Sequence, residues 1–256
     1  MTKILAALLL VLLTGALVTS CGDAPPPNTV HTLDDVRGSV IGARRDTPSE
    51  RMADELGYVH AFSSDDELMF HLLTGTLDCI IMEASAAAEL VADTARVRML
   101  NEPIMVYDLR FAIAIENSEL LRAVDAALVT LRANGTLRGL SDLYFAGRRF
   151  TYVPPQNVAR RPGYLSLAVS ADSPPFSFID EFGEFSGLDI DVARAVCDLL
   201  GVELKVIEYD AWELVRAVRY GRADLALGWL PSEGDEQLIN ISEPYAVAEH
   251  VVIVRR

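Results

Sequence analysis

Carboxylates and tryptophans are the side chains of this sequence with the most specific binding chemistry. Asp46, Glu83 and Asp235 would suit a cationic ligand if the fold gathered them beside Trp212 and Trp229. Carboxylates neutralise a positive charge, and the face of an indole ring attracts it. No nucleophile with a neighbouring base is readable, so the sequence predicts a binding site and assigns no catalytic residue.

The remaining residue types exclude several other kinds of site. Cys79 and Cys197 are interpreted as small buried apolar residues rather than as a disulfide. The formal net charge of −15 argues against a nucleic-acid partner, because phosphate binding needs clustered Lys and Arg. No metal or cofactor is expected, since the histidines lack metal-ligand spacing; they are His31, His60, His71 and His250.

The first 20 residues have the form of an export signal. Lys3 precedes an apolar run over 4–18, which is too short to be a good membrane-spanning helix. The run ends in Val-Thr-Ser-Cys, which resembles a bacterial lipobox with Cys21 as the lipidated residue. An ordinary cleaved signal with an incidental cysteine is the alternative. Residues 21–31 contain three consecutive prolines and are predicted to form a stiff tether.

Strand and helix patterns alternate along the rest of the chain, which predicts an α/β fold with mainly parallel sheets. In the first half, Thr47, Pro48 and Glu50 have the spacing of a capping box for a helix ending at Gly57, and Asp65 or Asp66 is expected to cap the next helix. The ranges expected to form strands are 38–43, 58–62, 77–82, 108–115, 164–169, 202–208, 223–228 and 250–254. The ranges expected to form helices are 47–56, 65–75, 84–92, 118–133, 137–145, 187–200 and 212–220.

Three segments together resemble the family 3 (amino-acid type) solute-binding proteins of ABC transporters. The stretch 172–191 resembles the start of that family's first lobe, and Ile241-Ser242-Glu243-Pro244-Tyr245 resembles its Phe-Ser-Asp-Pro-Tyr. Asn134-Gly135-Thr136 followed by Tyr144-Phe145 resembles its C-terminal signature. The resemblance implies the type II periplasmic binding protein fold, in which two lobes, each a sheet flanked by helices, enclose a ligand.

The order of these segments is reversed relative to the family, which predicts a circularly permuted chain. We expect lobe 2 at 32–107, strand and helices packing on lobe 1 at 108–145, a linker at 146–162 and lobe 1 at 163–256. The linker would join the old C-terminus to the old N-terminus, which often lie close together in a domain. A truncated tandem and a domain-swapped dimer are the structural alternatives.

The resemblance also implies which residues face the ligand, and several depart from the family. Asp235 stands where the family has the arginine that holds the ligand's carboxylate, unless the loop is shifted and Asp235 faces solvent. Leu230 replaces a hydroxyl donor, and Ser173 and Ser170 replace an aromatic clamp and an aspartate. These changes disfavour a carboxylate in the usual position, because two like charges at about 4 Å repel by roughly 4 kcal/mol at an effective dielectric constant of 20.

In lobe 2 the family's Gly-Thr-Thr carboxylate site is Asp46-Thr47-Pro48, and Pro48 has no N–H to donate. Glu83 matches the acid that receives the ligand's amino group, and Arg44 matches a pocket-lining position from which it would pair with Asp235 or bind an anionic group. Structural roles remain open for several of these, as a helix cap or a core residue. The candidate ligand-binding set is Arg44, Thr47, Glu83, Ser173, Phe176, Trp212, Gly228, Trp229 and Asp235.

The resulting functional hypothesis is an extracytoplasmic lipoprotein. It would be a monomer that closes on a small polar molecule, amino-acid-like or a cationic amine, and delivers it to an ABC permease. A sensory module with an altered ligand site is the second hypothesis. A dehydratase acting on cyclic carboxylates on the same scaffold is the third, and the missing arginine disfavours it.

Overall fold

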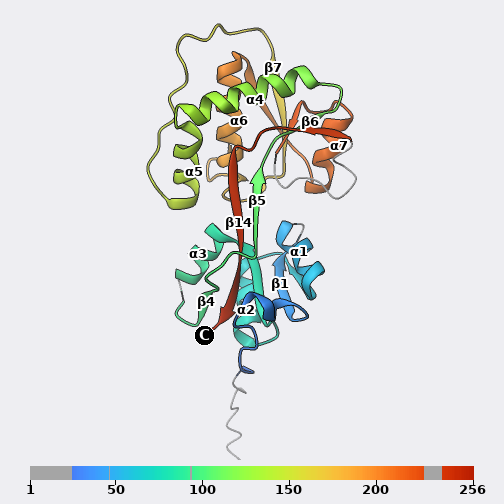
Figure 1. Cartoon of the computed structure of the whole chain (residues 1–256), viewed down its shortest axis with the longest axis vertical. Helices are drawn as coiled ribbons and strands as arrows, with labels where there is room; N and C mark the ends of the chain where they lie inside the picture. Colours follow the sequence, from blue (N-terminus) through green and yellow to red (C-terminus); the bar gives the residue numbers. More distant parts are fainter. Residues whose placement is uncertain (1–24, 46, 93, 228–237) are drawn as a thin grey trace, which may run out of the picture.

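The computed structural model describes residues 25–45, 47–92, 94–227 and 238–256. Within them the chain forms two lobes, each built around its own sheet, and two neighbouring strands connect the lobes (Figure 1). The connecting strands are β5 (Met105–Leu109) and β14 (Ala246–Arg255), which pair antiparallel along residues 246–250 of β14. The predicted α/β class with two lobes is confirmed.

The small lobe, at the bottom of Figure 1, contains a six-stranded sheet in the order β2-β1-β3-β14-β4, with β5 also paired to β14. Strand β3 alternates between two cores: Cys79 and Ile81 face one, while Ile80 and Met82 face the other. Burial on both faces explains its continuous apolar sequence. The remaining strands of this sheet are β1 (Val40–Arg44), β2 (Tyr58–Phe62), β3 (Cys79–Glu83) and β4 (Val97–Met99).

Helices cover both faces of this sheet; Thr47 is the N-cap residue of the first as predicted, whereas the predicted cap of the second is wrong. Thr47 occupies the cap position of the first helix, but its hydroxyl donates to the Arg44 carbonyl at 2.6 Å and makes no cap bond. Ser64, not Asp65 or Asp66, caps the second helix by accepting from the Glu67 N–H at 3.2 Å. The helical segments are η1 (Leu33–Val36), α1 (Pro48–Leu56), α2 (Asp65–Thr74) and α3 (Ala84–Ala92).

The start of the described chain packs against its end. Asn28 donates to the Arg255 carbonyl at 3.1 Å, and the Val30 side chain is fully buried. Arg255 in turn donates to the carbonyls of Leu72 and Leu77, at 2.7 and 2.5 Å. The predicted tether over 21–31 is therefore too long, because residues 28–31 belong to the folded small lobe.

The large lobe contains a five-stranded sheet in the order β11-β7-β12-β6-β13. Strands β11, β7, β12 and β13 run in one direction, and β6 runs antiparallel to its neighbours β12 and β13, so the sheet is mostly parallel as predicted. Its strands are β6 (Ala112–Ala114), β7 (Tyr164–Val169), β11 (Glu203–Glu208), β12 (Leu225–Ala226) and β13 (Ile239–Ile241). A small separate sheet consists of β8 (Asp172–Ser173), β9 (Ser177–Ile179) and β10 (Phe185–Ser186).

The helices of the large lobe match the predicted ranges closely because amphipathic periodicity is a local signal. The long helix starts at Asn117, whose side chain accepts from the Leu120 N–H at 3.2 Å. None of the helices in the described part of the molecule is long and apolar enough to cross a bilayer. The helical segments are α4 (Ser118–Ala133), α5 (Thr136–Ala146), α6 (Leu188–Leu200), η2 (Ala211–Glu213) and α7 (Leu214–Arg219).

Each half of the chain places a strand inside the sheet of the other half. Strand β6, from the first half, lies between β12 and β13, and β14, from the second half, lies between β3 and β4. The expected ranges need correction for this reason: residues 250–255 of the predicted lobe 1 pair with β3 and β4 of the small lobe. The predicted strand 108–115 is likewise two strands, one in each sheet, because the chain crosses between lobes there.

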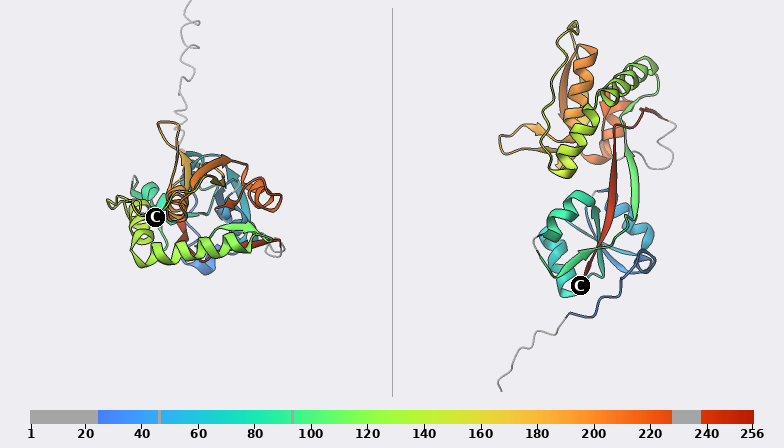
Figure 2. Two further views of the ribbon diagram at one scale, coloured as in Figure 1. Left: turned by 90° about the horizontal axis from the view of Figure 1, so that it is seen from above. Right: turned by 60° about the vertical axis from the view of Figure 1, so that its left-hand side comes forward.

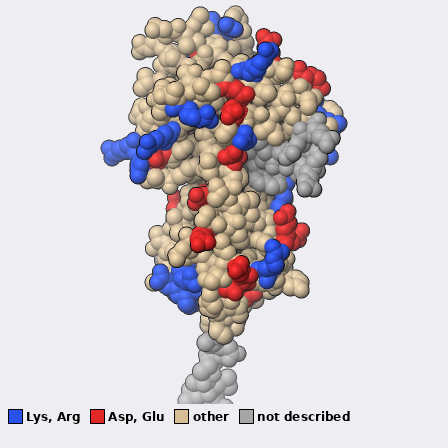
Figure 3. All heavy atoms as spheres, in the orientation of Figure 1, with Lys and Arg blue, Asp and Glu red and all other residues tan. Residues whose placement is uncertain are grey.

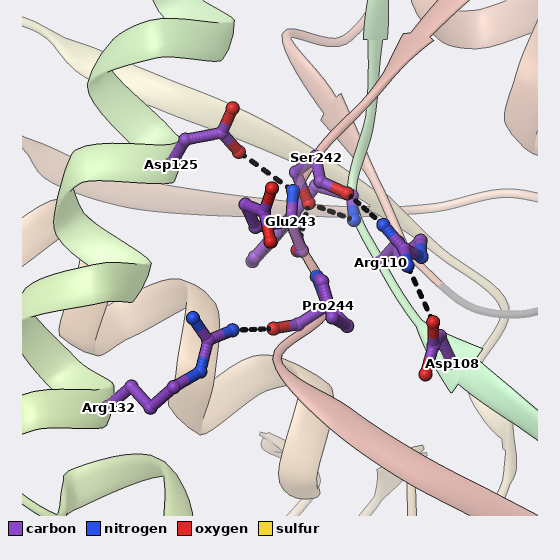
Figure 4. Close-up of polar contacts among 8 residues, drawn as sticks. Asp108, Arg110, Asp125, Arg132, Ser242, Glu243 and Pro244 are labelled. Atoms are coloured by element: carbon purple, nitrogen blue, oxygen red, sulfur yellow. Dashed lines mark hydrogen bonds and ion pairs between the residues drawn. The ribbon is translucent and has the colours of Figure 1, made fainter.

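The segment leading into β14 is held by side chains from the first half of the chain (Figure 4). Arg110 donates to the Ser242 carbonyl at 2.9 Å, and Arg132 donates to the Pro244 carbonyl at 2.5 Å. Asp125 accepts the Glu243 N–H at 2.8 Å. These bonds fix the point from which the connecting strand leaves the large lobe.

The segment joining the two halves is not a free loop. Residues 147–163 run along the outer side of the large lobe beside α6 (Figure 2). Arg160 pairs with Asp198 at 2.7 Å, and the Arg161 N–H donates to the Gly201 carbonyl at 2.7 Å. The segment predicted as a linker is thus anchored on the lobe it enters.

Candidate functional site

A cavity of about 160 Å³ lies between the lobes, next to the two connecting strands. The small lobe contributes the start of α1 and the junction of β3 with α3, while the large lobe contributes residues 170–177 and the start of α6. This volume suits a small solute, because pockets for drug-sized ligands span about 300–1,000 Å³. A second, more open hollow adjoins it and shares Thr47, Arg51, Ser170 and Ala211 with it.

The structure brings five of the predicted residues together in this cavity: Arg44, Thr47, Glu83, Ser173 and Phe176. Trp212 lines only the adjoining hollow, where it is 62% exposed and lies beneath the Arg216 guanidinium. The other candidates lie outside the described residues; they are Asp46, Gly228, Trp229, Leu230 and Asp235. Ligand contact by any of these residues remains a prediction.

Glu83 is held at the end of β3 by the first turn of α3. Its Oε2 accepts the N–H groups of Ser85 and Ala86, at 2.9 and 3.2 Å, and the Ser85 hydroxyl. Burial nevertheless raises the pKa of Glu83 above its ordinary value, because desolvation outweighs these bonds. A buried carboxylate facing a cavity favours a ligand that brings positive charge or N–H donors.

Arg44 ends strand β1, the parallel neighbour of β3, and pairs with Asp65 at 3.2 Å. Its Nε atom is buried and has no hydrogen-bond partner among the described residues. Ser49, in the first turn of α1, is 4% exposed and lines the same cavity. The Arg44 guanidinium offers N–H donors to an anionic or polar part of a solute.

Three further titratable residues line the cavity and were missed by the sequence analysis: Asp189, Tyr107 and His250. Asp189 is completely buried and accepts the Tyr245 hydroxyl at 2.6 Å. Its Oδ2 atom has no hydrogen-bond partner in the described part of the chain, and burial raises its pKa to about 6. The available signal was a carboxylate between two apolar residues of a helix, Leu188 and Ile190, since such a position is costly unless the carboxylate is paired.

Tyr107 and His250 belong to the two connecting strands, and their rings lie 5.2 Å apart between centroids. Burial lowers the pKa of His250 to about 4, so the imidazole is neutral near pH 7, and its Nδ1 atom has no hydrogen-bond partner within the described ranges. Burial also raises the pKa of Tyr107, with added repulsion from the negative charges of Glu83 and Asp189. Both carboxylates therefore act on the same region of the cavity.

The charges outside the cavity are mixed in sign. On the face drawn in Figure 3, basic and acidic side chains are interspersed over both lobes. No group of three residues able to hold a metal ion occurs in the described ranges. Cys79 and Cys197 are buried free thiols, one in each lobe. The interlobe cavity is therefore the feature that the site chemistry points to.

Comparison with known proteins also relates this chain to proteins that bind small solutes. Residues 165–256 match the model of the bacterial extracellular solute-binding proteins, family 3. The arginine-binding extracellular protein ArtP of Bacillus subtilis is 28% identical over 93 residues, 36% of each chain. The virulence sensor protein BvgS of Bordetella bronchiseptica is 24% identical over 246 residues, 84% of this chain and 20% of that protein. The chain thus spans about a fifth of BvgS and about a third of ArtP.

One solved structure matches most of the chain. A phosphate-binding protein of a Streptococcus pneumoniae phosphate ABC transporter aligns with a TM-score of 0.50, covering 86% of this chain and 89% of its own. The two sequences are 11% identical, so this similarity concerns the fold alone. It agrees with the type II periplasmic binding protein architecture.

Proposed function

We propose that the chain, whose residues 165–256 match the family 3 bacterial extracellular solute-binding proteins, captures a small polar solute between its lobes. The solute class is amino-acid-like molecules, including cationic amines. The observation that supports this most is the cavity lined from both lobes beside two connecting strands. Bending of these strands would close the lobes around a ligand.

We further propose that the captured solute is delivered to an ABC permease from outside the cytoplasm. The family description is extracellular, and the relative ArtP is an arginine-binding extracellular protein. Anchoring through Cys21 and a monomeric state complete this proposal. The proposed activity is binding without catalysis, in keeping with a family made up mainly of non-enzymatic binding proteins.

A sensory role is the second candidate, favoured by one observation. The similarity to BvgS runs through 84% of this chain, whereas the similarity to ArtP covers 36%. A longer sensor therefore contains these segments in the same order as this chain does. In such a role, closure of the lobes would be transmitted to a signalling partner instead of a permease.

The circular permutation remains our proposal for the chain order. It is supported by the connecting strand β14, which enters the small lobe and ends beside Asn28, where the described chain begins. In the proposed ancestral order, residue 256 would continue into the small lobe at this point. The anchored segment 147–163 would then be the added connection.

The experiment for the binding function is a calorimetric screen against amino acids, amines, polyamines and quaternary ammonium compounds. We expect at least one to bind the wild-type protein, and Glu83→Gln to weaken a cationic ligand by about tenfold or more, because a charged hydrogen-bond partner contributes about 1.5–3 kcal/mol. Glutamine preserves the acceptor that caps α3. The matched control is Glu249→Gln, an exposed residue on β14.

Failure of the whole panel to bind would contradict the proposed function. Equal effects of the Glu83 and Glu249 substitutions on the affinity would show that the ligand binds outside the cavity. Deletion of neighbouring permease or kinase genes in the source organism separates transport from sensing, according to which deletion removes the response to the identified solute. A turnover assay on cyclic carboxylates is expected to show no product.

A further inference from the structure

Asp189 is an unexplained charge in the interior of the molecule. Its side chain is completely buried, and its Oδ2 atom has no hydrogen-bond partner among the residues that the structure describes. The Tyr245 hydroxyl satisfies Oδ1 alone, and no salt bridge within the described part of the chain includes this carboxylate. Buried polar atoms are nearly always paired, so an unpaired carboxylate oxygen at a cavity wall indicates a missing partner.

The backbone around Asp189 fixes this carboxylate in place. Its N–H donates to the Phe176 carbonyl at 2.9 Å, and the Leu188 N–H donates to the Pro175 carbonyl at 3.0 Å. The first turn of α6 is thereby tied to the segment that forms the cavity wall in the large lobe. A carboxylate held this way cannot swing out to solvent to find a partner.

The surroundings of Asp189 show what kind of partner fits. Glu83 approaches from the small lobe, and the charges of both carboxylates raise the pKa of Tyr107. The neutral His250 imidazole, with Nδ1 unpartnered, lies beside Tyr107. The basic groups that line the cavity, Arg44 and Arg51, belong to β1 and α1 of the small lobe, and Arg44 is paired with Asp65.

We propose that Asp189 is a second binding residue for the ammonium group of the solute, contributed by the large lobe, beside Glu83, whose role belongs to the proposed function. This inference rests on the proposed function and specifies its ligand as a primary or secondary amine. An ammonium group has N–H donors for both carboxylates and for an acceptor nitrogen of His250. Because the two acids come from different lobes, the bound cation joins the lobes and favours closure.

The proposal predicts that binding is linked to a proton. A cation binds the ionised carboxylate, so the affinity is full above the pKa of Asp189, about 6, and falls roughly tenfold per pH unit below it. Binding near pH 6 also lowers this pKa and releases protons. His250, with a pKa of about 4, and Glu83, whose pKa is raised, face the same region and extend the decline toward lower pH.

The test is titration calorimetry with putrescine, lysine and glutamine, and with 1,4-butanediol as an uncharged analogue of putrescine. We expect at least one amine to bind, the diol not to bind, and Asp189→Asn to weaken the amine by about tenfold or more. Glu249→Gln, on the exposed side of β14, should leave the affinity unchanged. Repeating the wild-type titration at pH 6 in buffers of different ionisation enthalpy counts the released protons.

The outcomes separate this inference from the proposed function. Amine binding that is unaffected by Asp189→Asn and releases no protons overturns the inference and leaves the binding function standing. Binding of the diol as tightly as putrescine has the same consequence. Failure of every probe to bind overturns both. If the Asp189→Asn protein does not fold, the proton count of the Glu83→Gln protein decides, because Asp189 then remains as the cavity carboxylate whose pKa is raised by burial, and the absence of proton release overturns the inference.

Discussion

A Gly187→Val substitution is expected to lower the free energy of unfolding by about 3 kcal/mol or more. Gly187 has a φ of +123°, a conformation that non-glycine residues rarely adopt. A Cβ at this position would lie 2.2 Å from the Phe176 carbonyl oxygen. Since backbone atoms cannot move aside as a flexible side chain can, the substitution must displace Phe176 or the start of α6.

The control for this prediction is Gly183→Val. Gly183 also has a positive φ, +83°, but a Cβ there meets no atom within 4 Å. The Gly183→Val variant therefore measures the cost of the backbone conformation without the steric clash. Urea denaturation should show a loss of only about 1–2 kcal/mol for this control. If both variants lose the same free energy of unfolding, close packing around Gly187 does not contribute to the effect of the Gly187 substitution.

The Gly187 substitution should also abolish ligand binding at temperatures where the protein remains folded. Phe176 and Asp189 both line the cavity, and the Asp189 N–H donates to the Phe176 carbonyl that the new side chain would push away. A shift of this wall would misplace both residues. Calorimetry on the folded fraction measures the effect, and the Gly183 control should bind normally.

Separating the chain at its exposed connection gives the second large effect. Fragments 25–156 and 157–256 are expected to remain largely unfolded when produced alone, and to form a folded 1:1 complex when produced together. Each fragment lacks an interior strand of its own sheet: β6 comes from the first fragment and β14 from the second. An open gap in a sheet leaves backbone N–H and C=O groups unpaired.

Circular dichroism and thermal melts of each fragment, and of the co-expressed pair, measure this dependence. The cut lies between Gln156 and Asn157, which are both exposed. A fragment that unfolds cooperatively by itself, with native-like ellipticity, would show that the reciprocal strands are dispensable. The uncut protein serves as the reference for the complex.

The parts of the fold that could be predicted from the sequence were set by local physics. Helix α3 begins and ends at the predicted residues, and α4 spans 118–133 as its apolar stripe indicates. The exchange of β6 and β14 between the halves could not be read directly, because strand pairing over long sequence separations leaves no local pattern. The resemblance suggested only the crossing of β6, through the expectation that residues 108–145 pack on lobe 1.

The sequence predicted only those residues of the candidate site whose position follows from local structure. Glu83 and Arg44 follow buried strands, and the ends of parallel strands are where ligands bind in open α/β sheets. Asp189 was read as part of a motif, and its complete burial depends on Tyr245, 56 residues away in the sequence. His250 was read only as the start of a strand, because nothing in the sequence placed it against Tyr107.

The relation to BvgS makes the order of the halves the decisive question. A truncated tandem and a domain-swapped dimer both allow the same contacts to form between different chains. A permuted chain forms them within one molecule. These possibilities differ in one measurable property, which is whether the two lobes around the cavity belong to the same polypeptide.

The most direct test is the distance between spin labels at residues 58 and 220, exposed positions in the small and the large lobe. Labelled protein diluted into an excess of unlabelled chain should keep one well-defined interlobe distance, which shortens when a binding solute is added. Loss of that distance on dilution would show that the lobes pair between molecules. A defined distance that no bound solute changes would contradict closure around a ligand.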